Sequence, residues 1–224
     1  MLRRTRTAAL AFMLAPLLTG PARADDAGPT EPKLRAELLD RAAEDQKARR
    51  HLIDLQARPA GQDDGAKKEL EAAVQAVQDI DARNTARMKE VVDKYGWPGQ
   101  SLVGKDGAQQ AWLLVQHADR DRDFQKHCQA LLAEAVKKGE AAPDQLAYLT
   151  DRVRLAEGQK QVFGTQFHEV GGRMEPYPIE DEAGVDQRRK DIGLPSLADY
   201  RKMIEDLYKP KTSDKTDKQI ASVA

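Results

Sequence analysis

Charged side chains interrupt an apolar helical pattern near the start of the chain. Leu34, Leu38 and Ala42 recur at steps of four residues, as on one face of a helix, and Asp45 and Arg49 continue the same series. A charge turned toward a protein interior costs free energy unless it is paired or faces a wet pocket. The pattern therefore predicts either a buried ion pair or a polar site on this face.

A second stretch repeats this arrangement. Its apolar series of Leu70, Val74 and Val77 continues into Asp81 and Asn84 before apolar residues return. Two neighbouring helices with polar residues at inward positions bring those residues face to face. We therefore expect the two polar groups to share one region of the folded protein.

Later segments hold further polar and aromatic residues at places where a site can form. They lie where one expected helix ends and the next begins, within an interrupted apolar series, beside a glycine in an expected strand, and in a Tyr-Gly-Trp-Pro segment. We predict that most of these polar side chains line one cavity. The predicted ligand-binding residues are Asp45, Arg49, Asp81, Asn84, Trp97, Gln116, Asp119, Arg152 and Gln166, and the catalytic candidates are His117 and Asp151.

Histidine is the side chain in this set that is best suited to proton transfer near neutral pH. His117 with Asp119 or Asp151 has the composition of a general base and the carboxylate that orients it. Arg49 or Arg152 can hold an anionic group of a substrate through two hydrogen bonds. The alternative is a set of buried structural ion pairs and helix caps, and the sequence alone leaves both interpretations open.

No nucleophile or cofactor motif accompanies these residues. The sequence contains no Gly-x-Ser-x-Gly, and its single cysteine, Cys128, lies in an apolar helical pattern that predicts burial. Glycine patterns for phosphate or dinucleotide binding are also missing, so no cofactor is predicted. Asp123 and His127 have the spacing of two metal ligands on a helix, but we interpret them as a surface pair and predict no metal.

The composition limits the expected partners. The 224 residues include 36 Lys and Arg against 37 Asp and Glu, which gives a formal net charge of −1. This balance offers no electrostatic reason to expect nucleic acid or an anionic membrane as a partner. One cysteine also excludes an internal disulfide framework.

Residues 1–24 have the features of a signal peptide. Three arginines precede a short apolar run, and the sequence Ala-Arg-Ala at 22–24 matches a small-x-small cleavage site. The run is short for a membrane span, and no later apolar segment approaches the necessary length, so no span is expected after cleavage. The sequence therefore predicts an exported protein, either periplasmic or secreted.

Hydrophobic periodicity predicts a mainly α fold with one small antiparallel β-hairpin in the C-terminal third. A single helical domain is expected over 25–208, with a long helical hairpin at 31–94, a compact core at 95–208 and a disordered tail at 209–224. The expected helices are 31–56, 66–94, 107–118, 119–138, 143–157, 185–191 and 196–207, and the expected strands are 161–170 and 173–179.

Six short motifs follow one another along the chain: Asp45-Gln46…Arg49, Asp81…Asn84, Tyr95-Gly96-Trp97-Pro98, Gln116-His117-Ala118-Asp119, Ala147-Tyr148-Leu149-Thr150-Asp151-Arg152 and Phe163-Gly164-Thr165-Gln166. In this order they resemble a bacterial family of unknown function (domain of unknown function 6624). The resemblance covers about 34–200 and implies no particular activity, substrate or catalytic residue. Phe163 departs from the tyrosine expected at its position, which puts a hydroxyl contact in doubt.

Three functions remain open at this point. The chain could bind a small anionic or peptide-like ligand, act as a hydrolase-like enzyme with His117 as general base, or serve as a structural or interaction protein of the cell envelope. In the third case a partner protein would dock on the helices of 31–94. A pocket that contains His117, Asp151 and Arg152 favours the first two, whereas an exposed apolar patch on 31–94 favours the third.

Overall fold

The computed structural model describes residues 28–58, 64–171 and 173–208. Within these ranges the chain forms seven helices and one two-stranded antiparallel sheet, which confirms the predicted mainly α class with a hairpin in the C-terminal third. The predicted signal peptide and C-terminal tail lie outside the described residues. No helix in the described part of the chain has both the length and the apolar character that a membrane span requires.

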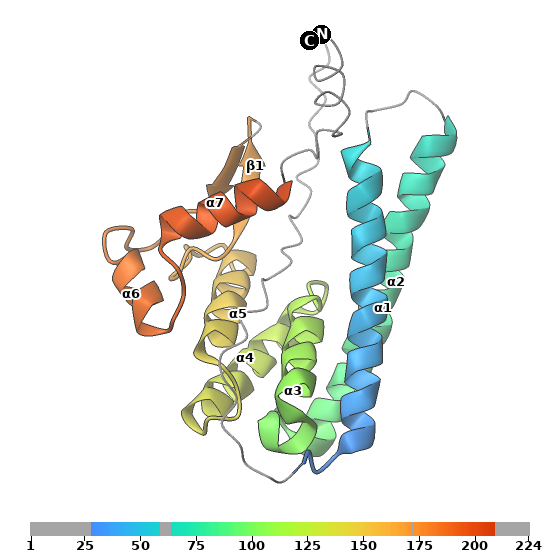
Figure 1. Ribbon diagram of the computed structural model, residues 1–224, viewed down its shortest axis with the longest axis vertical. Helices are drawn as coiled ribbons and strands as arrows, with labels where there is room; N and C mark the ends of the chain where they lie inside the picture. The colour runs from blue at the N-terminus through green and yellow to red at the C-terminus, as the bar shows by residue number, and fades with distance from the viewer. Residues whose placement is uncertain (1–27, 59–63, 172, 209–224) are drawn as a thin grey trace, which may run out of the picture.

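Two long helices, α1 (Pro32–Ala57) and α2 (Asp64–Tyr95), run antiparallel along one side of the molecule (Figure 1). Pro32 occupies the first turn of α1, where its missing N–H removes no helical hydrogen bond. A bidentate ion pair joins the two helices, because Arg87 Nε and Nη2 donate to the carboxylate of Glu37 at 2.8 and 2.9 Å. The pair links the first half of α1 to the second half of α2.

Three further helices pack beside the lower half of this hairpin in Figure 1: α3 (Gln100–Gln116), α4 (Arg122–Lys137) and α5 (Pro143–Ala156). The buried Trp112 anchors them, since its ring meets Tyr148 of α5 edge to face with centroids 5.8 Å apart. Its Nε1 donates to the backbone oxygen of Gln145 at 2.9 Å. Packed in this way, α3 runs along α1 and ends beside the middle of that helix.

α3 begins earlier than the sequence predicts, at Gln100 rather than at Gly107. Gly104 has a φ of 74° inside the helix and produces a kink that sequence patterns interpret as a loop. A Cβ at Gly107 would lie 2.9 Å from Cβ of Val103 within the kinked helix and 3.3 Å from Cγ of Arg35 on α1. Gly107 therefore serves both the kink of α3 and its approach to α1, and local propensity reveals neither requirement.

α4 begins three residues later than the expected helix of 119–138. Asp121 is its N-cap residue, and its Oδ1 accepts a hydrogen bond from the backbone N–H of Phe124 at 3.1 Å. Asp119 lies before the helix, and its carboxylate pairs with Arg152 of α5 at 2.9 Å. This ion pair ties the connection between α3 and α4, to which Asp119 belongs, to α5.

The C-terminal part consists of a β-hairpin and two helices. β1 (Phe167–Val170) pairs antiparallel with β2 (Arg173–Pro176), and α6 (Val185–Asp191) and α7 (Leu197–Tyr208) follow. The hairpin is shorter than predicted, because 161–166 forms a loop in which only Gln161 makes an isolated bridge, to Ile179. Tyr200 of α7 closes this part onto the core through edge contacts with Phe167 and Tyr148.

The buried apolar side chains form two separate clusters. The large one joins the first half of α1 and the second half of α2 to the rest of the fold, and the small one consists of Leu52, Leu55, Ala73 and Val77 with their neighbours. Asp45, Arg49 and Asp81 come between the two clusters along the helices. The charged residues that interrupt the sequence pattern thus mark the boundary between two apolar cores.

Candidate functional site

Arg49 lies between two carboxylates at the boundary of the two apolar clusters. Its Nε donates to Oδ1 of Asp45 at 3.0 Å within α1, and its Nη2 donates to Oδ1 of Asp81 on α2. The side chains of Arg49 and Asp45 are 2% and 1% exposed, and that of Asp81 is 16% exposed. A single guanidinium therefore faces two carboxylates where little water is present.

His117 joins this group from the C-terminal end of α3. Its Nδ1 lies 3.1 Å from Oδ1 and 3.0 Å from Oδ2 of Asp45, and its side chain is buried. Because a carboxylate only accepts hydrogen bonds, a neutral His117 donates through Nδ1 and carries its lone pair on Nε2. This is the tautomer of a histidine that acts as a base. We call Asp45, Arg49, Asp81 and His117 the acid–base cluster.

Burial raises the pKa of Asp81 to about 7. The charge of Arg49 opposes this change, whereas the negative charges of Asp45 and Asp119 add to it. The physical reason is that one guanidinium cannot compensate two carboxylates, and an uncompensated charge is most costly where water is scarce. Asp81 therefore takes up and releases a proton near neutral pH.

The pKa values of Asp45 and His117 are lowered, whereas that of Asp81 is raised. Burial disfavours the charged form of Asp45, but the hydrogen bond from His117 and the charge of Arg49 hold its pKa below the ordinary value. Burial also lowers the pKa of His117, assisted by the charges of Arg49 and Arg152, although its hydrogen bond to Asp45 acts against this. At neutral pH the cluster therefore contains an ionised Asp45 and a neutral His117, with Asp81 between its two forms.

A cavity of about 300 Å³ opens beside the acid–base cluster, between α2 and the connection from α3 to α4. Asp81 and His117 form part of its wall, together with Lys89, Arg120 and Asp121, and we call it the His117 cavity. Lys89 pairs with Asp121 and lowers the pKa of that carboxyl through their hydrogen bond, while Arg120 is exposed. The volume of the His117 cavity is at the lower end of the range for small-molecule sites.

Gln116, Asp119 and Arg152 form a second polar group next to the cluster. Nη1 of Arg152 lies 2.9 and 3.1 Å from the two carboxylate oxygens of Asp119, and its Nε donates to Gln116 at 3.3 Å. The side chain of Gln125 also donates to Asp119, at 3.2 Å. These residues do not line the His117 cavity. Two of them still influence the cavity wall: the positive charge of Arg152 lowers the pKa of His117, and the negative charge of Asp119 raises the pKa of Asp81.

Asp151, predicted as catalytic, is fully buried and holds the loop of 161–166. Its carboxylate accepts hydrogen bonds from the backbone N–H groups of Val162, Phe163 and Thr165 at 2.7, 3.0 and 2.9 Å. The hydroxyl of Thr165 donates to it as well, at 2.9 Å. Burial raises the pKa of Asp151 against these hydrogen bonds. The structure therefore brings Asp45, and neither Asp151 nor Asp119, to Nδ1 of His117.

Three more of the predicted binding residues do not line the His117 cavity. Gln166 donates to Oγ1 of Thr165 at 3.1 Å and belongs to the loop that Asp151 holds. Asn84 accepts a hydrogen bond from Arg41 at 3.2 Å, and Trp97 lies in the wall of a different cavity. The predicted set is thus divided among the acid–base cluster, its polar neighbours, Asn84 one turn along α2 from Asp81, and two other parts of the fold that hold Trp97 and Gln166.

Sequence reasoning missed three charged residues of the cavity wall: Lys89, Arg120 and Asp121. A signal existed for the first, because Lys89 follows Asp81 by two turns and therefore shares its side of α2. Arg120 and Asp121 carry no comparable signal, since they lie in the short connection between α3 and α4, where no periodicity applies.

The donor set also permits a test against metal binding. Asp45, Asp81 and His117 each offer one ligand atom, and these atoms lie within 4.8 Å of one another. Arg49 donates to both carboxylates, so a divalent cation would have to compete with a guanidinium for the same oxygens. The sequence-derived candidates Asp123 and His127 are exposed on α4. The geometry favours Arg49 as the cation that balances the two carboxylates.

Comparison with protein families identifies one match. The model of a family of unknown function (DUF6624) matches 32–213, which is most of the chain, and the protein belongs to this family. No curated protein and no solved structure matches the chain. Functional inference therefore rests on the geometry of the site.

Proposed function

We propose that this member of the family of unknown function binds a small anionic or peptide-like ligand in the His117 cavity. The observation that carries the proposal is that Asp81 and His117, from separate helices, meet on the wall of a cavity that also holds two cationic side chains. A charged group at the boundary of two apolar cores lowers stability unless every member is paired. Recognition of a ligand explains why such a group is placed beside an open cavity.

The charges of the wall favour an anionic ligand. When Asp81 is protonated, Lys89 and Arg120 supply two positive charges against the single negative charge of Asp121, and His117 is neutral; when Asp81 is ionised, the charges of the wall balance. An anion in the cavity stabilises the protonated form of Asp81, because like charges raise the pKa of a carboxyl. We therefore expect proton uptake on binding and a higher affinity below pH 7 than above it.

Calorimetric titration with small carboxylates, inorganic phosphate and short acidic peptides at pH 6 and pH 8 tests this proposal. A ligand that binds the folded protein also raises its melting temperature. Arg120→Gln should weaken binding, whereas Lys67→Gln, which removes an exposed cation from the far end of α2, should not. If none of these anions binds, or if both variants lose affinity equally, the proposal is wrong.

Acid–base catalysis is the second candidate, in the form of a hydrolase-like activity with His117 as general base. It is favoured by the contact of Asp45 with Nδ1 of His117 and by the pKa of Asp81 near 7 on the same cavity wall. Two neighbouring titratable groups whose pKa values are shifted in opposite directions, as those of Asp81 and His117 are, are the usual signature of such a site. A protonated Asp81 would supply the acid.

A panel of nitrophenyl esters, nitrophenyl phosphates and peptide amides tests for this activity. We expect turnover to decline above pH 7 as Asp81 ionises, and His117→Gln to reduce it by about 100-fold or more. Asp93→Asn, on the exposed side of α2, is the matched control and should keep full activity. Anion binding without turnover of any substrate in the panel would leave the binding function and reject the catalytic one.

Export to the periplasm or the medium is a separate proposal, supported by the pattern of residues 1–24. The intact mass of the protein recovered from the cell envelope tests it, and cleavage after Ala24 is the expected result. A protein that retains Met1 and stays with the membrane fraction would contradict it.

A further inference from the structure

The two walls of the His117 cavity run side by side from one end to the other. Asp81 and His117 lie at one end, where an oxygen of Asp81 and a ring nitrogen of His117 are within 4.8 Å of each other. Lys89 and Asp121 lie at the other end, where Nζ of Lys89 is 2.5 Å from Oδ2 of Asp121. Between these ends one wall follows α2, and the other follows the connection from α3 to α4. The cavity is therefore an elongated groove along α2.

The length of the groove limits what fits in it. Asp81 and Lys89 are two turns apart on α2, which corresponds to about 12 Å along the helix axis. Each residue of an extended peptide advances the chain by about 3.5 Å. A segment of about three residues therefore reaches from one end of the groove to the other.

Small side chains form the floor of the groove. Ala82 and Ala86 are exposed on α2, and Ala118 lies in the opposite wall. The hydroxyl of Thr85, next to Ala86, donates to the backbone oxygen of Asp81 at 2.7 Å, so it can only accept a hydrogen bond from a ligand. The floor therefore leaves room for a narrow chain with small side chains and offers an acceptor to an N–H group.

One cation at the Lys89 end is open to a ligand. Arg120 is exposed, lines the groove and directly precedes Asp121 in the chain. Within 28–58, 64–171 and 173–208 it makes no ion pair or side-chain hydrogen bond, whereas Lys89 is already paired with Asp121. A guanidinium holds a carboxylate through two parallel hydrogen bonds. This end therefore matches a single carboxylate.

Asp81 supplies a hydrogen-bond donor at the other end. Its side chain is 16% exposed, and burial raises its pKa to about 7, so it is mostly protonated at pH 6. A protonated carboxyl donates its O–H, which a carbonyl oxygen of a ligand can accept. A hydrocarbon would cover the same group without a hydrogen bond, at a cost in free energy. This end therefore favours an amide over an alkyl chain.

We propose that the His117 cavity binds the C-terminal segment of a peptide with small side chains, an inference that rests on the binding function proposed above. The terminal carboxylate contacts Arg120 beside the pair of Lys89 and Asp121. The backbone of the peptide follows α2 across Ala82 and Ala86. A carbonyl about three residues before the carboxylate accepts from Asp81.

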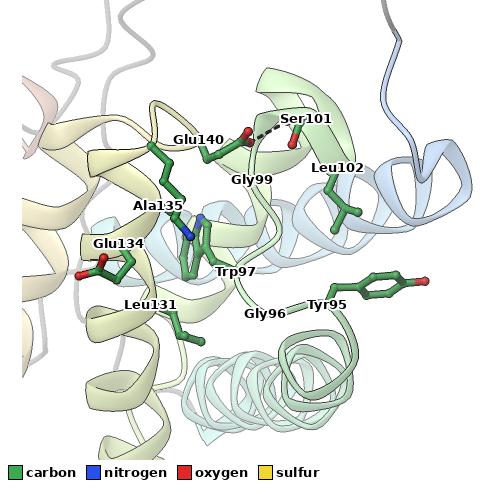
Figure 2. Close-up of a pocket in the computed structure, with 11 residues that line it drawn as sticks. Tyr95, Gly96, Trp97, Gly99, Ser101, Leu102, Leu131, Glu134, Ala135 and Glu140 are labelled. Atoms are coloured by element: carbon green, nitrogen blue, oxygen red, sulfur yellow. Dashed lines mark hydrogen bonds between the residues drawn. The ribbon is translucent and has the colours of Figure 1, made fainter.

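Titration calorimetry at pH 6 with N-acetyl-trialanine and with its C-terminal amide tests the charged end, because the amide lacks only the carboxylate. We expect the acid to bind about ten times more tightly or better. Arg120→Gln should abolish this preference. Lys138→Gln is the matched control, since it removes an exposed cation from the separate cavity lined by Trp97 and Glu140 (Figure 2), which shares no residue with the groove.

The length and floor of the groove supply a second readout. In a series of N-acetyl-oligoalanines, affinity should rise from one residue to three and stay level at four, because the fourth residue extends beyond Asp81. Ala86→Leu should weaken binding of the trialanine about tenfold by filling the floor. Ala76→Leu, at an exposed position of α2 outside the groove, should leave it unchanged.

Inorganic phosphate and octanoate, titrated in parallel, separate this inference from the binding function on which it rests. Phosphate binding without a preference for the peptide acid over its amide would overturn the inference and leave anion binding in place. Octanoate that binds as tightly as the trialanine, or an equal loss of affinity in Arg120→Gln and Lys138→Gln, would overturn it as well. If neither phosphate, octanoate nor any peptide binds, the binding function itself is rejected.

Discussion

Replacing Asp81 with asparagine should change how the stability of the protein depends on pH. The folded protein keeps a proton on Asp81 up to a pKa of about 7, whereas the unfolded chain releases it near 3.8. A group with a raised carboxyl pKa binds more protons in the folded state, so its contribution to stability falls as pH rises through this interval. Asparagine cannot ionise, and the variant should lack this loss.

The size of the effect follows from the two pKa values. A pKa of about 7 against 3.8 corresponds to a preference of about 4 kcal/mol for the protonated carboxyl in the folded state. Between pH 5 and pH 8 the wild type should lose about 3 kcal/mol of this contribution, because part of it has gone already below pH 5. The stability of Asp81→Asn relative to the wild type should therefore rise by that amount over the same range.

Urea unfolding followed by circular dichroism at several pH values between 5 and 8 measures this difference directly. Asp93→Asn removes an exposed carboxylate from the same helix and should run parallel to the wild type. If Asp81→Asn also runs parallel to the wild type, Asp81 is ionised throughout. The guanidinium of Arg49 would then compensate both carboxylates, and the reasoning about the acid–base cluster would be refuted.

Three further predictions follow from the contacts. Asp45→Asn and His117→Gln should show a coupling free energy of about 1 kcal/mol or more in a double-mutant cycle of urea unfolding, whereas Asp151→Asn and His117→Gln should be additive. Asp151→Asn should also speed amide hydrogen exchange at Thr165, because the loop loses one of the two carboxyl oxygens that accept its N–H groups; unchanged exchange would contradict the role of that carboxyl group. Burial raises the pKa of Cys128 to about 12, so its thiol should react with a disulfide reagent at pH 8 only after unfolding.

Most of the helices could be predicted because their signals are local. The range 185–191 agrees with α6, and the expected helix of 143–157 ends one residue beyond α5. The failures have tertiary causes. The helix predicted over 107–118 begins too late because Gly104 and Gly107, which sequence patterns interpret as loop signals, lie inside a kinked helix. The strand of 161–170 was extended too far because its β-like residues begin with a segment whose N–H groups bond to Asp151.

The inward direction of Asp45, Arg49 and Asp81 could also be predicted, because each residue continues an apolar series on its own helix. Their partners could not. A plausible fold can bring any of several aspartates next to His117, and the sequence pattern favours Asp119 and Asp151 as its partners. Both are occupied elsewhere, Asp119 by Arg152 and Asp151 by a loop whose backbone donors need an acceptor. Which carboxylate remains for the histidine is decided by the packing of α3 against α1.

The raised pKa of Asp81 arises only when the two helices pack against each other. On α1 alone, Asp45 and Arg49 form a matched ion pair at a spacing of one turn, and Asp81 on α2 has no cation beside it. When the helices pack, Asp81 comes to share the same guanidinium, and the two carboxylates then outnumber the cation. Protonation of Asp81 removes the excess negative charge, which costs less free energy than keeping a second buried carboxylate ionised. The pKa of Asp81 near 7 therefore results from the packing of α1 against α2, and the charges along either helix alone do not predict it.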